Sequence, residues 1–217
     1  ALHGSIDVQK IDSDFLAFSG YKIFGPMLGV LWGKRPLLSR MKPYRVETNK
    51  NEVPFKYEQG TLSNASLASL GAALKYLLWL ADELEPEKAP EGEERRARFT
   101  RAMKSISIYE AEISRLILRA FEKFPQERFL FYGIRNPGQH RERDPTFAFE
   151  IAGRSAEEVK RQFWERRGIQ IADGNHYSAV FFRALNRESV CRSSFAHYNS
   201  LEEAKAFLAA LEEILAG

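Results

Sequence analysis

The sequence predicts an α/β fold, because short apolar runs typical of strands are interspersed with longer stretches that have helical periodicity. Two such runs, Phe15–Phe18 and Leu28–Trp32, lie near the N-terminus. Residues 146–151 alternate, with Phe147, Phe149 and Ile151 on one face, as in a half-buried strand. From residue 64 onward, apolar residues recur every three or four positions, which indicates an amphipathic helix.

Lys22 follows the first apolar run on a tight turn. The run Phe15–Phe18 is short, unbroken and ended by a Ser-Gly pair, which favours a strand buried on both faces of a parallel sheet. A lysine on a turn is most often a solvated charge. The end of a buried strand is nevertheless a suitable place to hold a lysine that takes part in chemistry.

The rest of the first half is expected to contain two helices. Residues 6–11 indicate a short connection, and Arg35–Met41 a short helix with proline in its first turn. Residues 42–58 are polar and contain two prolines, so we expect an irregular surface excursion. Ser63 or Asn64 can cap the next helix. Its expected apolar face comprises Leu67, Leu70, Leu74, Leu77, Ala81 and Leu84.

The acidic stretch Asp82–Glu94 contains two prolines and a glycine and predicts a loop. A long helix is expected to follow it, with one face formed by Phe99, Met103, Ile106, Tyr109, Ile113, Leu116 and Ala120. Its start carries four arginines, at positions 95, 96, 98 and 101, which could contact the phosphates of a nucleic acid. Because glutamates precede them, we expect a solvated, salt-bridged face and no nucleic-acid partner.

After Pro125 the pattern is that of a smaller α/β unit. The expected strands are Arg128–Tyr132, Thr146–Ile151, Gly168–Ile171 and Val190–Phe195. Two capping boxes, Ser155 with Glu158 and Ser200 with Glu203, predict the starts of two helices. The final helix is expected to bury Leu201, Ala204, Leu208, Leu211 and Leu215.

The composition is that of a globular protein, with 217 residues, 44% hydrophobic, 28% charged and a formal net charge of +3. This charge is too small to argue for nucleic-acid binding by itself. The sequence lacks an apolar run of about eighteen residues, so we expect no membrane partner. Its N-terminal residues lack the pattern of a signal peptide. One cysteine cannot form an internal disulfide, which is consistent with a cytoplasmic location.

Three segments share a pattern with a known family. Around Lys22, DFLAFSGYKIFGP contains an aspartate, an apolar strand, Ser-Gly, an aromatic residue, the lysine, another aromatic residue and Gly-Pro. PFKYEQGT (residues 54–61) contains a Glu-x-Gly-Thr turn, and CRSSFAHYNS (residues 191–200) an Arg-Ser-x-x-x-Tyr-Asn segment. In this order the segments resemble the class V aminotransferase and cysteine desulfurase family. That family belongs to the fold-type I group of pyridoxal 5'-phosphate (PLP) enzymes.

The resemblance implies PLP as cofactor and assigns its ligands. Lys22 would be the catalytic lysine, whose amine forms an imine with the cofactor aldehyde and moves protons afterwards. Ser19 would donate to the cofactor phosphate. Tyr21 stands where relatives often have a phosphate-binding histidine, but a phenol cannot carry a positive charge. Gly60 and Thr61 would form a phosphate contact that reaches the active site of a neighbouring subunit, or only a turn before the helix.

The resemblance also implies residues for an amino-acid substrate. Arg192 matches the arginine that holds the substrate carboxylate, which a planar guanidinium can do through two parallel hydrogen bonds. Without the surrounding motif, a surface salt bridge would be the better interpretation of an arginine in a strand. Asn175 and His176 could line the substrate pocket, although a structural role fits His176 equally well.

One feature departs from the cysteine desulfurase pattern. These enzymes carry a mobile cysteine upstream of the arginine, and Tyr177 stands at about that place. Cys191, in a predicted strand, is expected to be a buried, inert thiol. The leading interpretation is a cysteine desulfurase-like enzyme, a sulfur transferase or lyase, that lacks the usual nucleophile. An aminotransferase or epimerase of the same family and a non-catalytic dimerisation or binding fragment are the alternatives.

The resemblance covers only the C-terminal half of the family's architecture. Residues 1–107 would be the C-terminal part of the PLP-binding large domain, and residues 108–217 a small α+β C-terminal domain. The family's aspartate for the ring nitrogen lies further upstream, so we expect an N-terminal half to be supplied from elsewhere. The shared phosphate turn implies a homodimer.

Overall fold

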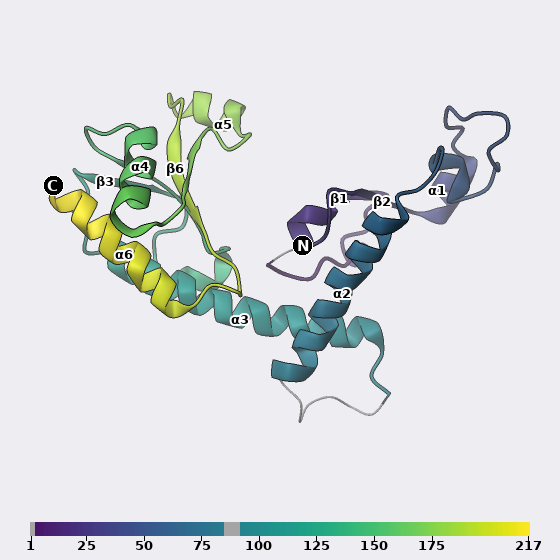
Figure 1. The fold of residues 1–217 in the computed structure, drawn as a ribbon, viewed down its shortest axis with the longest axis horizontal. Helices are drawn as coiled ribbons and strands as arrows, with labels where there is room; N and C mark the ends of the chain where they lie inside the picture. Colours follow the sequence, from purple (N-terminus) through teal and green to yellow (C-terminus); the bar gives the residue numbers. More distant parts are fainter. Residues whose placement is uncertain (1–2, 85–91) are drawn as a thin grey trace. The chain divides into compact units, whose positions relative to one another are not determined.

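The computed structural model describes residues 3–84 and 92–217, which divide into two compact units, Ala1–Ser105 and Ile106–Gly217. Helix α3 (Arg95–Phe121) begins in the first unit and ends in the second (Figure 1). The predicted division after residue 107 lies close to this one. No helix in the described ranges is both long enough and apolar enough to span a membrane.

The first unit contains a two-stranded antiparallel sheet and helix α2. Strand β1 (Phe15–Ser19) pairs with β2 (Gly29–Gly33), and the 3₁₀ turn η1 (Gly20–Ile23) follows β1 directly. Helix α1 (Arg35–Arg40) has proline in its first turn, as predicted. The excursion after α1 contains the 3₁₀ turn η2 (Phe55–Tyr57) and leads to α2 (Asn64–Leu84).

Strand β1 corrects one prediction. It is not buried on both faces of a parallel sheet, because Phe15 and Ala17 are exposed and its partner β2 is antiparallel. The connection Gly20–Leu28 is shorter than the crossover of a dozen or more residues that parallel strands require. The short connection, which can be read from the sequence, is therefore enough to exclude parallel pairing of β1 with β2.

The start of α2 agrees with prediction, and its buried face agrees in part, because Leu77 and Ala81 are buried as predicted. The Ser63 hydroxyl accepts a hydrogen bond from the Ser66 amide at 3.4 Å, so Ser63 caps the helix. The buried side chains, spaced four residues apart, are Ala73, Leu77 and Ala81, whereas Leu67, Leu74 and Leu84 are exposed. Helix α2 also extends into the predicted acidic loop, since Asp82–Leu84 is helical; residues 85–91 of that loop lie outside the described residues.

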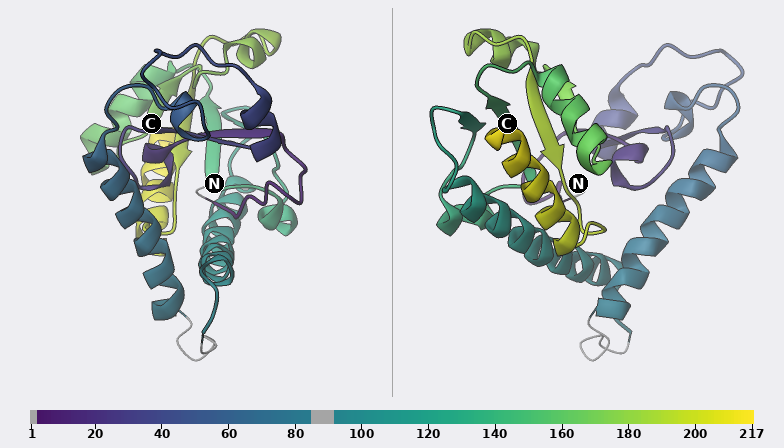
Figure 2. Two further views of the ribbon diagram at one scale, coloured as in Figure 1. Left: turned by 90° about the vertical axis from the view of Figure 1, so that its right-hand side faces the viewer. Right: turned by 60° about the vertical axis from the view of Figure 1, so that its left-hand side comes forward.

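The second unit has a four-stranded antiparallel sheet with the order β3-β4-β6-β5. Its elements along the chain are β3 (Phe129–Tyr132), η4 (Pro137–Glu142), β4 (Thr146–Ile151), α4 (Ala156–Arg167), β5 (Ala172–Gly174), α5 (Ala179–Ala184), β6 (Val190–Ser194) and α6 (Leu201–Ala216). Figures 1 and 2 show α4 and α6 beside the strands of this sheet. Both predicted caps form, because Ser155 and Ser200 accept from the amides of Glu158 and Glu203.

An aromatic core joins the sheet of the second unit to its helices. Phe147 and Phe149 of β4 are fully buried, and Phe163 of α4 stacks on Phe207 of α6 at 5.2 Å. The predicted strand Gly168–Ile171 is wrong. Gly168 ends α4 in the left-handed conformation, with φ of 63°, and strand β5 begins four residues later.

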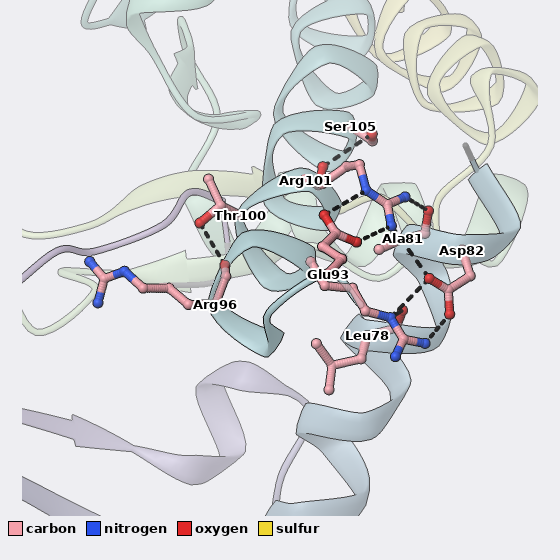
Figure 3. A network of polar contacts seen from close by, with 9 residues as sticks. Leu78, Ala81, Asp82, Glu93, Arg96, Thr100, Arg101 and Ser105 are labelled. Carbon is pink, nitrogen blue, oxygen red and sulfur yellow. Dashed lines mark hydrogen bonds and ion pairs between the residues drawn. The ribbon is translucent and has the colours of Figure 1, made fainter. Parts of the chain in front are cut away.

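Three of the arginines at the start of α3, Arg96, Arg98 and Arg101, pair with carboxylates. Figure 3 shows the contacts of Arg101 with Glu93 and with Ala81. The Arg101 guanidinium donates to Glu93 at 2.8 Å and also to the Ala81 carbonyl at the end of α2. Arg98 donates to Asp82 from the same turn of α3. The side chains of Arg101 and Glu93 are each 12% exposed. These contacts fasten the start of α3 to the end of α2, which favours a structural role for the cluster.

Replacing Arg101 with alanine should therefore destabilise the protein by about 3 kcal/mol, because the mutation strands a nearly buried carboxylate. Urea unfolding followed by circular dichroism measures this loss. Arg96→Ala is the matched control, since Arg96 pairs with Asp7 at 2.5 Å on the surface and should cost less than about 1 kcal/mol. Equal losses for the two variants would contradict the structural role assigned to Arg101.

Candidate functional site

The turn that carries Lys22 is closed by backbone hydrogen bonds. The Gly20 amide donates to the Leu28 carbonyl at 2.6 Å, and the Gly25 amide donates to the Gly20 carbonyl at 2.9 Å. A Cβ at Gly20 would lie 2.8 Å from the Pro26 carbonyl oxygen, closer than real Cβ contacts. Only glycine fits this approach, so the backbone that carries Lys22 is fixed.

Helix α2 supports this turn. Phe24 ends η1 in the left-handed conformation, with φ of 65°, which is costly for a residue that is not glycine. Its ring packs edge-on against Tyr76 of α2 at 5.8 Å. A Cβ on Gly25 would meet Leu70 of α2 at 3.0 Å. The strained turn therefore depends on close packing against α2.

Lys22 and Ser19 line one cavity of about 690 Å³ within the first unit. Its wall is mostly apolar, and its polar side chains are those of Lys22, Ser19 and His3. The Ser19 hydroxyl does not cap the turn that follows it. The apolar wall includes Ile6, Leu16, Phe18, Ile23, Leu77 and Phe99.

This lining fits PLP in the chemistry of its groups. Lys22 provides an amine for a covalent link, Ser19 provides a hydroxyl donor for a phosphate, and apolar side chains provide surface for a ring. Tyr21, Gly60 and Thr61 are not among the described residues that line the cavity. The Tyr21 ring lies 5.8 Å from the Lys22 ammonium and is half exposed, and the Gly60-Thr61 turn is exposed.

Arg192 belongs to the second unit and points away from its aromatic core. In the sheet, Cys191 pairs with Phe149 and both are buried, so the next residue of β6 faces the other side. There Arg192 lies between Ala148 and Ala172. Its Nε atom is buried and has no hydrogen-bond partner within the described ranges. A buried donor without a partner is unusual and suits a group that receives a ligand.

His176 lies near Arg192. Burial lowers the pKa of His176, and the Arg192 guanidinium lowers it further, whereas the Val190 carbonyl and Asp173 act in the opposite direction. The Nε2 atom is 3.0 Å from the Val190 carbonyl oxygen. The structure thus places the His176 imidazole within electrostatic reach of the Arg192 guanidinium.

Asn175 has a role in the local turn. Its side-chain oxygen accepts a hydrogen bond from the Tyr177 amide at 3.1 Å, and its carbonyl accepts one from the Ser178 amide at 2.8 Å. Tyr177, at the place where the resemblance suggests a cysteine, has a fully exposed side chain and a positive φ of 61°. Asn175 itself is exposed.

Cys191 is buried, as predicted for an inert thiol. Its side chain is 1% exposed and its sulfur donates to the Ala156 carbonyl. Burial raises the pKa of Cys191 to about 12, and the nearby carboxylates of Asp173 and Glu150 raise it in the same direction. The thiolate, which is the nucleophilic form, is therefore scarce at neutral pH.

Comparison with protein families decides the affiliation. The model of the aminotransferase class-V family matches residues 1–97 and 97–207. This chain belongs to the aminotransferase class-V family. Members of this family use PLP, so the chemistry of the Lys22 cavity agrees with the affiliation.

Curated class-V relatives are cysteine desulfurases. Those from Pectobacterium carotovorum strain PC1 and Serratia proteamaculans strain 568 are 31% and 29% identical over 98% of this chain. The chain spans 48% of the length of each. Identity and coverage together relate this chain to the C-terminal half of these enzymes.

Solved class-V structures share the fold. The cysteine desulfurase CsdA from Escherichia coli matches 99% of this chain with a TM-score of 0.77 at 26% identity, and this chain covers 49% of it. The apo cysteine desulfurase from Thermococcus onnurineus NA1 matches 99% of this chain with a TM-score of 0.78 at 23% identity, and this chain covers 50% of it. The predicted α/β fold, as part of a fold-type I PLP enzyme, is confirmed.

Two further residues of the first unit were not among the site residues expected from the sequence. His3 lines the Lys22 cavity, and Lys56 is buried beside the end of α1. Both lie inside or next to matched segments, His3 just upstream of the Lys22 segment and Lys56 within PFKYEQGT. That proximity was the available signal, but it did not reveal which atoms they face.

Native Cys191 should resist alkylation. At pH 8 a thiol of pKa about 12 is ionised in roughly one molecule in ten thousand, and its burial also blocks the reagent. Iodoacetamide labelling measured by mass spectrometry should be slow in the folded protein and fast in 6 M guanidinium chloride. Fast labelling of the folded protein would show that the thiol opens to solvent and would contradict the inert assignment.

Proposed function

We propose that this chain forms part of a PLP-dependent enzyme that acts on an amino acid with cysteine desulfurase-like chemistry. The observation that carries the proposal is the cavity in which a fixed turn places Lys22 and Ser19 together within an apolar wall. The family affiliation supports the same cofactor. The curated relatives, which are cysteine desulfurases, support the reaction class.

The residues of the first unit would hold the cofactor. When bound, PLP supplies an electron sink for the bonds of the substrate's α-carbon. Lys22 would hold it covalently and, once displaced by substrate, carry a proton on its Nζ atom. Ser19 would donate to the phosphate, and the Tyr21 phenol would add a weaker donor. The exposed Gly60-Thr61 turn would donate to the phosphate of a second copy, as in a homodimer with shared sites.

Arg192 would orient the substrate. Its guanidinium can donate two parallel hydrogen bonds to the α-carboxylate, which fixes the direction of the α-carbon bonds. The buried Nε donor without a partner supports this role. His176 is close enough for electrostatic influence and would remain neutral near pH 7. It would contribute hydrogen bonding without adding a second positive charge.

The lack of a suitable thiol favours a second candidate function, because cysteine desulfurases use a nucleophilic cysteine. Cys191 is buried with a raised pKa, and Tyr177 stands where the sequence pattern suggests a mobile cysteine. Sulfur transfer through a protein thiol would then lack its nucleophile. We therefore propose an aminotransferase or epimerase as the alternative, since proton transfer by Lys22 suffices for either reaction.

The proposed enzyme needs more of the class-V fold than this chain spans. The chain covers about half of the relatives' length. The partner of the cofactor's ring nitrogen is expected in the other half, as are further neighbours for the partly exposed strand β1. We infer that the other half joins this chain, either in the same polypeptide or as a second one.

Lys22→Ala should abolish covalent cofactor binding. Incubation with equimolar PLP and reduction with borohydride should place the adduct on the peptide that contains Lys22, because the cavity favours this amine over solvated lysines. Peptide mapping by mass spectrometry gives the site. Lys42→Ala, at an exposed position, is the matched control and should keep the adduct. An unchanged yield of adduct in the Lys22 variant would refute the assignment.

Arg192→Ala should weaken binding of a carboxylate-bearing substrate. We expect the dissociation constant of L-cysteine to rise about thirtyfold or more, since loss of a charged partner costs about 2 kcal/mol or more. Changes in the absorbance of the bound cofactor report binding in the assembled, PLP-loaded protein. Cysteamine, which lacks the carboxylate, should bind equally to both proteins. A similar loss of cysteamine affinity would assign Arg192 a general structural role.

A further inference from the structure

Lys56 is a buried lysine with neutral partners. Lys56 is only 3% exposed, and its ammonium donates to the carbonyls of Ser39 at 2.9 Å and Met41 at 2.7 Å. The ring of Tyr57 lies 5.3 Å from the ammonium. Both carbonyls belong to the C-terminal end of α1, where a helix leaves carbonyl groups without internal partners. Lys56 thus caps α1 from a distant part of the chain.

A lysine is a costly choice for this position. Burying an ammonium removes its hydration, and an apolar side chain could fill the same volume. A methionine would however leave the carbonyls of Ser39 and Met41 without their donor. The charge at Lys56 therefore links two segments, the end of α1 and η2, which packing alone would join less specifically.

The residues after Lys56 are held in the same way. The Tyr57 hydroxyl donates to the Leu38 carbonyl at 2.7 Å. The Gln59 side chain donates to the Lys56 carbonyl at 3.0 Å and accepts from the Val46 amide at 3.4 Å. The chain is thus fastened to α1 and its following segment as far as Gln59.

The next two residues are open. Gly60 adopts a positive φ of 71°, and a Cβ there would meet nothing within 4 Å. Thr61 is exposed. A turn with a firmly held base and an open tip is preorganised for a ligand, because its binding conformation needs little further ordering.

We propose that Lys56 is a positioning residue for the phosphate of PLP. It would hold the base of the Gly60-Thr61 turn so that the backbone and hydroxyl of the tip can donate to the phosphate of PLP in a second copy. This inference rests on the proposed function and adds a residue that acts through the turn, without itself touching the cofactor.

The test compares PLP with pyridoxal, which has the same aldehyde but no phosphate. Dissociation constants come from the amount of Lys22 adduct trapped by borohydride over a range of aldehyde concentrations. Lys56→Met should weaken PLP binding about tenfold, the value of one good hydrogen bond, and leave pyridoxal within about twofold. Lys56→Arg should restore much of the PLP affinity, because a guanidinium can donate to both carbonyls. Lys50→Met, at a nearby exposed lysine, should change neither constant.

Two further measurements separate positioning from folding. Amide hydrogen exchange in residues 58–62 should be faster in Lys56→Met, whereas exchange in the β1–β2 hairpin should not change. Tyr57→Phe removes only the bond to Leu38 and should shift the PLP constant in the same direction by a smaller factor. This variant serves if Lys56→Met does not fold.

Equal losses for PLP and pyridoxal, or no loss for either, would overturn the positioning role. Trapping of both aldehydes at Lys22 with no phosphate preference in the unmodified protein would overturn it as well, yet leave the Lys22 assignment standing. Absence of any Lys22 adduct would overturn both the proposed function and this inference.

Discussion

The close backbone approach at Gly20 is the constraint on which the first unit's site depends. Because any Cβ at this position would lie 2.8 Å from the Pro26 carbonyl oxygen, the sharp turn at the end of β1 requires glycine. The turn then places Ser19 and Lys22 on one cavity wall. Phe24 accepts an unfavourable backbone conformation, which its packing against Tyr76 offsets. Local strain, helix packing and the placing of the Lys22 amine are thus parts of one arrangement.

In the second unit, the alternation of side chains along β6 determines where the candidate site residue Arg192 lies. Cys191 and Arg192 are neighbours in sequence but lie on opposite faces of the sheet. The inward residue joins Phe149 in the core and its thiol becomes unreactive, whereas the outward one keeps a guanidinium beside His176. The same two-residue period that builds the core therefore also separates a buried thiol from a candidate ligand group. A one-residue shift of register would exchange these environments.

Periodicity and capping chemistry predicted most elements but not their surroundings. Strand β4 and the start of α6 followed from alternation and from the Ser200 capping box. The parallel setting of β1 was wrong because an apolar run reports burial, whereas the length of its connection limits its partners. Helix α2 buries Ala73 together with the predicted Leu77 and Ala81, but leaves Leu67, Leu74 and Leu84 exposed, because a leucine pattern does not say which part of the helix face a neighbouring element covers. Of the candidate site, the local motif around Lys22 was enough to predict that Ser19 and Lys22 lie close together.

Two cations of the first unit, Arg101 and Lys56, differ in how far their partners can be inferred from the sequence. Arg101 is neutralised by Glu93 and Asp82, and the glutamates that precede the arginines of α3 already suggested ion pairs. Lys56 instead donates to carbonyls 15 and 17 residues earlier in the chain. Every residue carries a carbonyl, so no residue type marks these partners in the sequence. A cation bound by carboxylates can therefore be recognised from composition, whereas one bound by backbone is recognised only from the fold. A residue of the second kind can connect a turn to its support, and Lys56 does so between η2 and the end of α1, just before the Gly60-Thr61 turn.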